Sequence, residues 1–264
     1  MNILEKILAK KKIEIEINKN INSIKKLENN VLFNRNIISL KKSIKKNLFG
    51  VIAEFKLKSP SKGIINSTSI VENVVKKYFL AKVSGISILT DYHFSGCINH
   101  IKKSRPLVSI PLLRKDFIID EYQVIESKSI GADVILLIAS ILSKKKIKIL
   151  SKIARSIGLE VIIELHNESE LEKITDNIDF IGINNRDLKS FNVNKKNSFV
   201  LYKKIPCNYI KLAESGINNI EDIINLKKLG FDGFLIGEYF MKEKDPGKKC
   251  INLMKLLNNE NYKI

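Results

Sequence analysis

The stretch that decides the fold reads VIAEFK at residues 51–56 and continues as LKSPSKG at residues 57–63. The first half is apolar, and the second half contains the serine, proline and glycine typical of a loop, so we predict a short buried strand that ends there. Glu54 and Lys56 are two residues apart and would share one face of that strand. Charged side chains are rarely buried unless they are paired or used. The pair therefore indicates either a structural ion pair or a functional site.

Similar apolar runs recur along the chain. We count eight, near residues 51–56, 86–90, 111–114, 133–138, 160–164, 179–184, 209–213 and 232–236. Lysine-rich stretches with helical periodicity lie after them, near residues 69–82, 98–104, 121–130, 143–157, 167–175, 195–203, 218–229 and 247–258. Eight strand–helix units predict the α/β class and a (β/α)8 TIM barrel. The sequence has no G-x-G-x-x-G motif, which argues against a dinucleotide-binding Rossmann fold.

The residues before the first predicted strand have a helical pattern of their own. Apolar residues alternate with lysine and glutamate from residue 2 to about 18, and a second helical stretch reaches about Leu48. No Gly/Ser-rich linker separates these residues from the first predicted strand. We therefore predict a single domain over residues 1–264, with residues 1–48 as an N-terminal helical extension of the barrel.

Composition narrows the function classes. The chain has 264 residues, of which 44% are hydrophobic, enough for a large core. No apolar run approaches the roughly 18 residues of a membrane span, and we find no signal-peptide cleavage site, so we expect a cytoplasmic enzyme with no membrane partner. Three scattered cysteines and three histidines lack metal-ligand spacing, which predicts no disulfide framework and no metal. His166 follows a strand end and could lie near a site, but we favour a loop histidine that faces solvent.

The chain is strongly basic. It has 46 Lys and Arg against 28 Asp and Glu, a net charge of +18. Such a balance is compatible with a nucleic-acid partner. The excess is mostly lysine spread over nearly every predicted helix, and no basic patch is interleaved with aromatic residues. We therefore expect no nucleic acid as partner and a small anionic substrate instead. Nothing in the sequence fixes the oligomeric state, and a monomer is favoured.

Polar groups gather where the predicted strands end. In (β/α)8 barrels the catalytic groups come from the C-terminal ends of the strands. Six of the eight predicted strands end in acids, bases, amides or small residues: Glu54 and Lys56, Lys115, Glu164, Asn184 and Arg186, Glu214 to Gly216, and Gly237. Ordinary loop starts explain solvated Asp, Asn and Ser. They explain poorly why Lys56, Lys115 and Glu164 directly adjoin apolar runs, so we predict one polar cavity.

The last two strands add a second signal. Ser215-Gly216 and Gly237 follow the seventh and eighth predicted strands. Small residues let backbone N–H groups approach an anion, and phosphate sites after strands 7 and 8 are frequent in this fold. Each glycine alone would indicate a tight turn. Together they favour a phosphorylated substrate.

These stretches form an ordered series that covers essentially the whole chain. They read IAEFK at 52–56 with SPSKG at 59–63, LRKDFIID at 113–120, IGINNRDL at 181–188, ESGI at 214–217 and LIG at 235–237. In this series the chain resembles the indole-3-glycerol phosphate synthase family. The alternatives are other phosphate-binding barrels, such as phosphoribosylanthranilate isomerase or the tryptophan synthase α subunit. The set Glu54, Lys56, Lys115 and Glu164 argues against both.

The resemblance implies a reaction in tryptophan biosynthesis. The family closes the indole ring of 1-(2-carboxyphenylamino)-1-deoxyribulose 5-phosphate, with loss of carbon dioxide and water, to give indole-3-glycerol phosphate. No cofactor or metal is implied. Some relatives are fused to phosphoribosylanthranilate isomerase, and we do not expect that second activity here.

The resemblance also implies catalytic roles. Lys115 resembles the family's general acid. Its ammonium group is useful in that role if neighbouring cations or partial burial lower its pKa. Lys56 can share or take that role, so the assignment of each lysine to a step stays open. Glu164 resembles the acid–base group of the dehydration. Glu54 would orient and charge-balance the two lysines, and Asn184 would hydrogen-bond the developing oxygen.

A second set of residues would bind the substrate. Arg186 and Ser59 are suited to its carboxylate, and Phe117 with Phe94 would flank its aromatic ring. The remaining set follows the last two strands and would surround the phosphate: Glu214, Ser215, Gly216, Gly237 and the backbone N–H of Glu238. Some relatives have a small hydroxyl residue at position 238, so we expect the Glu238 carboxylate to turn away. The loop over residues 90–96 is one residue shorter than the usual pattern.

Overall fold

The computed structural model describes residues 3–188, 190 and 192–259. Eight parallel strands close into a barrel in the order β1, β4, β5, β6, β7, β8, β9 and β10, with β10 pairing back to β1. The predicted (β/α)8 barrel is therefore confirmed, strand by strand. The strands are β1 (Gly50–Phe55), β4 (Gly85–Leu89), β5 (Leu112–Lys115), β6 (Val134–Ile138), β7 (Glu160–Leu165), β8 (Phe180–Asn184), β9 (Ile210–Glu214) and β10 (Gly233–Ile236).

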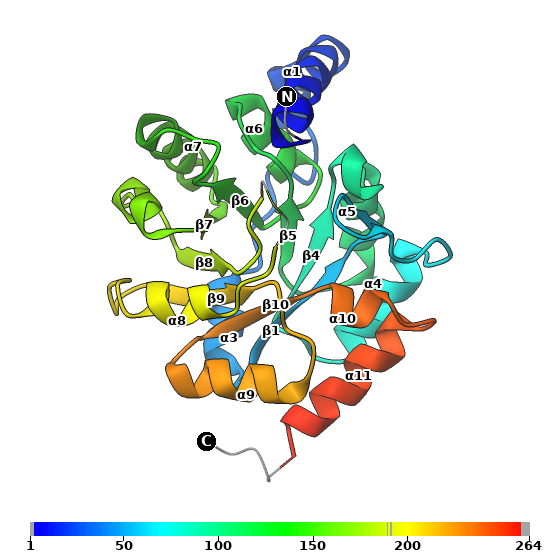
Figure 1. The fold of residues 1–264 in the computed structure, drawn as a ribbon. Coiled ribbons are helices and arrows are strands. Elements are labelled where there is room, and N and C mark those ends of the chain that lie inside the picture. Colours follow the sequence, from blue (N-terminus) through cyan, green and yellow to red (C-terminus); the bar gives the residue numbers. More distant parts are fainter. Residues whose placement is uncertain (1–2, 189, 191, 260–264) are drawn as a thin grey trace.

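Helices surround the strands as an outer layer (Figure 1). The longer ones are α4 (Val71–Leu80), α5 (Ile98–Ser104), α6 (Glu121–Ser129), α7 (Lys144–Ser156), α8 (Lys196–Tyr202), α9 (Ile220–Leu229) and α11 (Pro246–Leu257). Short elements lie between them: the strands β2 (Lys58–Ser59) and β3 (Gly63–Ile64), the helix α10 (Glu238–Met241), and the 3-10 helices η1 (Tyr92–Phe94), η2 (Arg105–Leu107) and η3 (Glu168–Lys173).

One predicted helix is a different element. Within the predicted helix over residues 167–175, Glu168–Lys173 form the 3-10 helix η3 rather than an α-helix. The Glu170 carboxylate accepts hydrogen bonds from the backbone N–H of His166 at 2.7 Å and from the Asn167 side chain at 3.0 Å. These side-chain bonds hold the start of the segment in a tight turn, which competes with regular helix formation.

The core has two layers, because successive strand residues point to opposite sides of the barrel wall. On β7, Val161 and Ile163 pack outward against the helices, whereas Ile162 packs inside the barrel. All three are fully buried. This arrangement explains why the strands read as continuous apolar runs rather than as alternating patterns.

The N-terminal extension is three helices rather than two: α1 (Ile3–Ile21), α2 (Ile24–Glu28) and α3 (Leu40–Lys46). The predicted start of the first helix at residue 2 lies outside the described residues. The Ser23 side chain accepts an N-cap hydrogen bond from Lys26 N, and the Ser39 side chain accepts one from Lys42 N. Each cap begins a new helix, so the stretch that was predicted to reach Leu48 is divided into α2 and α3.

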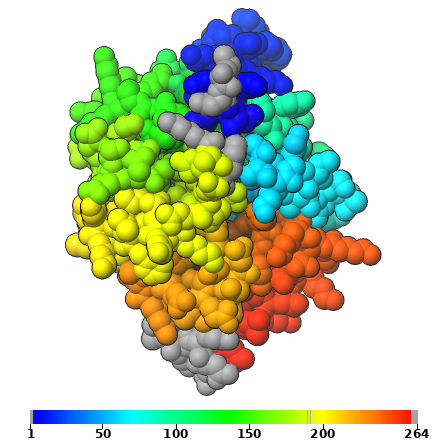
Figure 2. Space-filling model, in the orientation of Figure 1, coloured from blue at the N-terminus to red at the C-terminus, as the bar shows by residue number. Residues whose placement is uncertain are grey.

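The extension reaches both ends of the barrel. At the N-terminal end of the strands, the backbone N–H of Leu40 donates to Glu160 at 2.7 Å, and Ile44 faces Gly50 and Gly233. At the other end, Leu4 and Ile7 of α1 join the core cluster that contains Phe117. Figure 1 shows α1 beside α6, and in the space-filling view of Figure 2 the blue N-terminal residues form the upper end of the molecule. The shared core supports our proposal of one domain.

Candidate active site

A cavity with two adjoining lobes opens at the C-terminal ends of the strands. The outer lobe has a volume of about 610 Å³ and is lined by Ser215, Gly216, Gly237 and Glu238 among others. The inner lobe, of about 100 Å³, is lined by Phe94, Lys115, Phe117, Glu164 and Asn184 among others. Glu54, Lys56, Arg186 and Ser215 line both lobes. All fourteen residues predicted from the sequence as site residues line this cavity.

Lys115 lies at the centre of the inner lobe. Its Nζ is 2.7 Å from Glu164 Oε2 and 3.1 Å from Glu214 Oε2. The three side chains come from β5, β7 and β9, which are alternate strands and so contribute to the same interior layer of a barrel. The side chain of Lys115 is 14% exposed, whereas both carboxylates are 1% exposed. Lys115 is thus the most exposed member of this group, and all three side chains line the inner lobe.

A glycine on the intervening strand makes room for this group. A Cβ added at Gly182 of β8 would lie 2.2 Å from Glu214 Oε1. Real side chains do not approach so closely, so any larger residue here would displace Glu214. The glycine in the predicted IGIN run therefore serves the site as well as the strand.

The electrostatics of Lys115 differ from our expectation. Burial alone would lower its pKa, but the carboxylates of Glu164, Glu214 and Glu54 outweigh that effect and raise the pKa above the ordinary lysine value. The condition under which an ammonium is a better acid, a lowered pKa, is therefore not met at Lys115. The site surrounds Lys115 with acids rather than cations, which keeps it a protonated donor.

The two carboxyl groups beside Lys115 titrate differently. Burial disfavours the Glu164 carboxylate, yet Lys115 and His166 hold its pKa well below the usual range. Burial raises the pKa of Glu214 to about 8, with Glu164 adding to the rise and Lys115 opposing it. Of the two carboxyl groups, Glu164 is therefore the one held ionised, and Glu214 is the one that binds a proton more readily than an ordinary carboxyl.

Glu54 and Lys56, which were predicted to share one face of the first strand, form a second ion pair. Lys56 Nζ lies 2.8 Å from Glu54 Oε1, as their shared strand face predicted. Glu54 is buried, and Lys56 is partly exposed toward the cavity. A Cβ at Gly237 would clash with Glu54 Oε1, so a larger residue at position 237 would displace this carboxylate.

His166 was misjudged from the sequence. Its side chain is 5% exposed, and Nε2 lies 3.1 Å from Glu164 Oε1. The signal was present, because Glu164 and His166 are two apart at the end of β7, the same spacing as Glu54 and Lys56. The expectation that it faces solvent was therefore wrong.

Two phenylalanines form one wall of the inner lobe. The rings of Phe94 and Phe117 have centroids 6.3 Å apart and are tilted by 36°. Phe94 belongs to η1, whose N-cap Asp91 accepts a hydrogen bond from His93 N. The shorter loop over residues 90–96 thus still brings an aromatic ring to the site.

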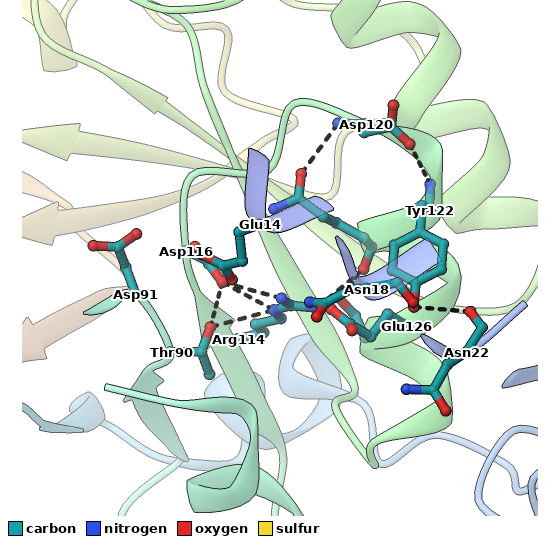
Figure 3. A network of polar contacts seen from close by, with 12 residues as sticks. Glu14, Asn18, Asn22, Thr90, Asp91, Arg114, Asp116, Asp120, Tyr122 and Glu126 are labelled. Atoms are coloured by element: carbon teal, nitrogen blue, oxygen red, sulfur yellow. Dashed lines mark hydrogen bonds and ion pairs between the residues drawn. The ribbon is translucent and has the colours of Figure 1, made fainter. Parts of the chain in front are cut away.

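A buried lysine of the N-terminal helix holds this wall from behind. Lys11 is 1% exposed, and its Nζ lies 2.9 Å from both Asp91 Oδ2 and Asp116 Oδ1. Figure 3 shows Asp116 between Thr90 and Arg114, which also bind it. Nothing in the sequence singled out Lys11, because a lysine in a lysine-rich amphipathic helix is ordinarily solvated.

At the outer lobe the predicted Lys58–Gly63 loop is a hairpin of β2 and β3. Arg186 Nη1 donates to Ser61 at 3.1 Å, and its Nη2 lies 3.4 Å from Glu238 Oε2. Lys62 Nζ is 3.9 Å from Glu238 Oε1. The Glu238 carboxylate therefore faces the cavity beside two cations, and our expectation that it turns away was wrong.

Asn184, Ser59 and the loop after β9 complete the polar lining of the cavity. Asn184 Oδ1 accepts from the backbone N–H of Arg186 at 2.9 Å, which orients its Nδ2 as the group that can donate. Ser59 is buried, and its Oγ accepts from Lys62 N at 3.2 Å. Ser215 and Gly216 both have positive φ, 65° and 79°, so the loop after β9 is sharply turned where it lines the outer lobe.

Comparison with known proteins decides the family. A family model described as indole-3-glycerol phosphate synthase matches residues 4–253. A protein of that name from Bacteroides thetaiotaomicron is 42% identical over 97% of this chain and 99% of its own length. Another from Petrotoga mobilis is 45% identical over 79% of this chain and 85% of its own length.

The chain belongs to the indole-3-glycerol phosphate synthase family. Among solved structures, tryptophan synthase subunit alpha from Legionella pneumophila matches with a TM-score of 0.59 at 12% identity, covering 81% of this chain and 95% of its own. 3-Hexulose-6-phosphate synthase from Salmonella typhimurium matches with a TM-score of 0.59 at 13% identity, covering 79% and 99%. At these identities the likeness extends to the barrel fold alone.

Two further findings concern metals and membranes. Within residues 3–188, 190 and 192–259, no cluster of three or more His, Cys, Asp or Glu side chains is arranged to hold a metal ion. No helix in that part of the chain is long and apolar enough to cross a membrane.

Proposed function

We propose that the two-lobed cavity carries out the reaction of the indole-3-glycerol phosphate synthase family. The substrate is 1-(2-carboxyphenylamino)-1-deoxyribulose 5-phosphate, and the enzyme is a carboxy-lyase of tryptophan biosynthesis. The observation that carries the proposal is the Lys115–Glu164 pair, joined at 2.7 Å at the end of two barrel strands beside an aromatic wall. The reaction needs an acid and a base next to an aromatic ring, and this pair supplies both.

The shape of the cavity supports one orientation of the substrate. The phosphate belongs in the outer lobe, where Ser215, Gly216 and Gly237 bring the backbone close and Lys62 supplies positive charge. The aromatic ring belongs in the inner lobe against Phe94 and Phe117. The substrate carboxylate would then replace Glu238 as the partner of Arg186, whose guanidinium can bind two oxygens at once.

Ring closure joins a ring carbon to the carbonyl carbon of the deoxyribulose chain. Negative charge develops on the carbonyl oxygen, and Lys115 Nζ donates a proton to it, leaving a neutral amine and a hydroxyl group. Asn184 adds a hydrogen bond to that oxygen. The carboxylate on the same ring carbon then leaves as carbon dioxide, and its electron pair restores the ring. Lys56, held by Glu54 at 2.8 Å, is the second candidate donor.

Dehydration completes the indole. The hydroxyl group leaves as water after it takes a proton, and a proton leaves the ring system. Glu164 is the acid–base group for this step, because it is ionised and shares a hydrogen bond with Lys115. Glu164 takes the proton from the ring system and delivers it to the leaving hydroxyl group, so it ends the step ionised. Lys115, left neutral by ring closure, regains its proton from solvent, because loss of the carboxylate as carbon dioxide consumes one proton per turnover.

The test is the appearance of indole fluorescence when purified protein is mixed with the substrate. The chain has no tryptophan, so the background is low. We expect turnover in wild type, and Lys115→Met and Glu164→Gln to lower kcat by about 10²–10⁴-fold, the usual contribution of a general acid or base. Lys42→Met, on the exposed face of α3, is the matched control and should leave kcat unchanged. Full activity in both site variants would refute the assignment.

Other properties stay predictions from the sequence. We propose that the enzyme works in the cytoplasm as a monomer, and that its partner is the small phosphorylated substrate rather than nucleic acid. Size-exclusion chromatography with light scattering tests the monomer. A salt-sensitive association with DNA or RNA would contradict the last point.

A further inference from the structure

Glu164 contacts a cation at each of its two oxygens. Oε2 lies 2.7 Å from Lys115 Nζ, and Oε1 lies 3.1 Å from His166 Nε2. Lys115 comes from β5, and His166 follows the last residue of β7. Lys115 faces the inner lobe, whereas His166 is absent from the residues that line either lobe. The imidazole therefore acts on the carboxylate from the side away from the substrate.

A second carboxylate lies on the far side of the imidazole. His166 Nδ1 is 3.7 Å from Glu170 Oε2 of η3. Glu170 is itself fixed, because it accepts from the backbone N–H of His166 and from Asn167. On the α8 side the neighbour is neutral, since Asn197 donates to the backbone carbonyl of His166 at 2.9 Å. The histidine thus lies between two buried acids.

This arrangement favours a charged imidazole. Burial alone would lower the pKa of His166, but Glu164 and Glu170 outweigh it and raise the pKa to about 9. Within the described residues neither ring nitrogen has an aligned hydrogen-bond partner. The contact with Glu164 is therefore mainly an attraction between charges, which in a buried site is screened little by solvent.

We propose that His166 is a positioning residue that holds Glu164 ionised and oriented toward Lys115. The proposal rests on the proposed function, in which Lys115 gives its proton to the substrate oxygen. At that moment Glu164 loses its cationic neighbour, while Glu214 remains beside it. Without a second cation the Glu164 carboxylate would bind a proton more readily and would be a weaker base for dehydration. His166 keeps its own proton throughout and supplies the charge that remains.

The proposal predicts a change in pH dependence. Replacing His166 by Gln removes an opposite charge about 3 Å from Glu164, so the acid limb of the kcat profile should move up by about one pH unit or more. KM should change little, because His166 does not line the cavity. His166→Lys, which restores a positive charge, should return part of the shift. If His166→Gln acted only through lost packing, it would lower kcat or stability without moving the acid limb of the kcat profile.

The experiment measures kcat and KM from about pH 5 to 9 for wild type, His166→Gln, His166→Lys and Glu170→Gln. The control is His100→Gln, which removes a partly buried histidine of α5 outside the cavity. Glu170→Gln should not move the acid limb up, because the imidazole stays protonated at acid pH. Superimposable profiles of wild type and His166→Gln would overturn the proposal. No turnover in wild type would instead overturn the proposed function.

A second measurement does not depend on activity. The chain has three histidines, so a protein labelled with ¹³C-histidine has three ring signals to follow with pH. The His166 signal, assigned by its loss in His166→Gln, should titrate near pH 9 and at lower pH in Glu170→Gln. Titration near 6.5, the ordinary histidine value, would overturn the proposal even if the substrate assay failed.

Discussion

Replacing Lys11 by Met tests how the N-terminal helix is held on the barrel. The substitution keeps most of the buried aliphatic chain and removes the ammonium that lies 2.9 Å from both Asp91 and Asp116. Those carboxylates are 2% and 0% exposed, so they cannot gain solvent in compensation. In Lys11→Met, Asp116 keeps its ion pair with Arg114. Among the described charged groups, Asp91 keeps only its contact with His93.

The expected loss of stability follows from this burial. Removing one partner of a buried ion pair typically costs about 3–5 kcal/mol, because the other charge stays buried and uncompensated. Lys19→Met is the matched control on the same helix. Lys19 pairs with Glu16 and Asp120, but its side chain is 35% exposed, and such pairs contribute about 0–1 kcal/mol. The two variants should therefore differ by more than about 2 kcal/mol.

Urea unfolding followed by circular dichroism measures this difference. Lys11→Met should lower the free energy of unfolding far more than Lys19→Met, and Asp91→Asn should recover part of the loss in the double variant because one unpaired charge is removed. Lys11→Met should also raise KM, because Asp91 and Asp116 adjoin the loops that bear Phe94 and Phe117. Inhibition by inorganic phosphate, which tests only the outer lobe, should not change. Equal stability of Lys11→Met and Lys19→Met would refute the reasoning.

Two further predictions concern the carboxyl groups of the cavity. The folded-state pKa of Glu214, about 8, is above its unfolded value of about 4.3, so its contribution to stability is complete below pH 4 and is lost as pH rises through 8. Glu214→Gln should remove this loss, which amounts to about 1.4 kcal/mol per pH unit at most, as unfolding curves at pH 5, 7 and 9 can measure. Glu238→Gln removes the anion that pairs with Arg186 and Lys62, so inorganic phosphate should inhibit up to about fivefold more strongly, as expected for partly exposed pairs. Unchanged inhibition would mean that Glu238 does not compete with the substrate for these cations.

The sequence predicted the barrel architecture and a set of residues that line one cavity. Each buried strand is a short apolar run that can be recognised from adjacent residues alone. All eight barrel strands could therefore be predicted to within a few residues. Once the barrel was predicted, the rule that the C-terminal strand ends meet at one face brought the fourteen site residues together. The same local reasoning failed at residues 167–175, where a side-chain carboxylate turned a predicted helix into η3.

Which charged groups pair with one another depends on the closed barrel and could not be predicted from the sequence. Lys115 and Glu164 are 49 residues apart, and Lys11 reaches carboxylates on two strand ends far along the chain. Local sequence carries no signal for such pairs, and a buried lysine looks the same in sequence as a solvated one. The pKa values of Lys115, Glu214 and His166 depend on burial and on the sum of charges from several strands. Those quantities exist only once the barrel has closed, because closure excludes water and brings the strand ends within a few ångströms of one another.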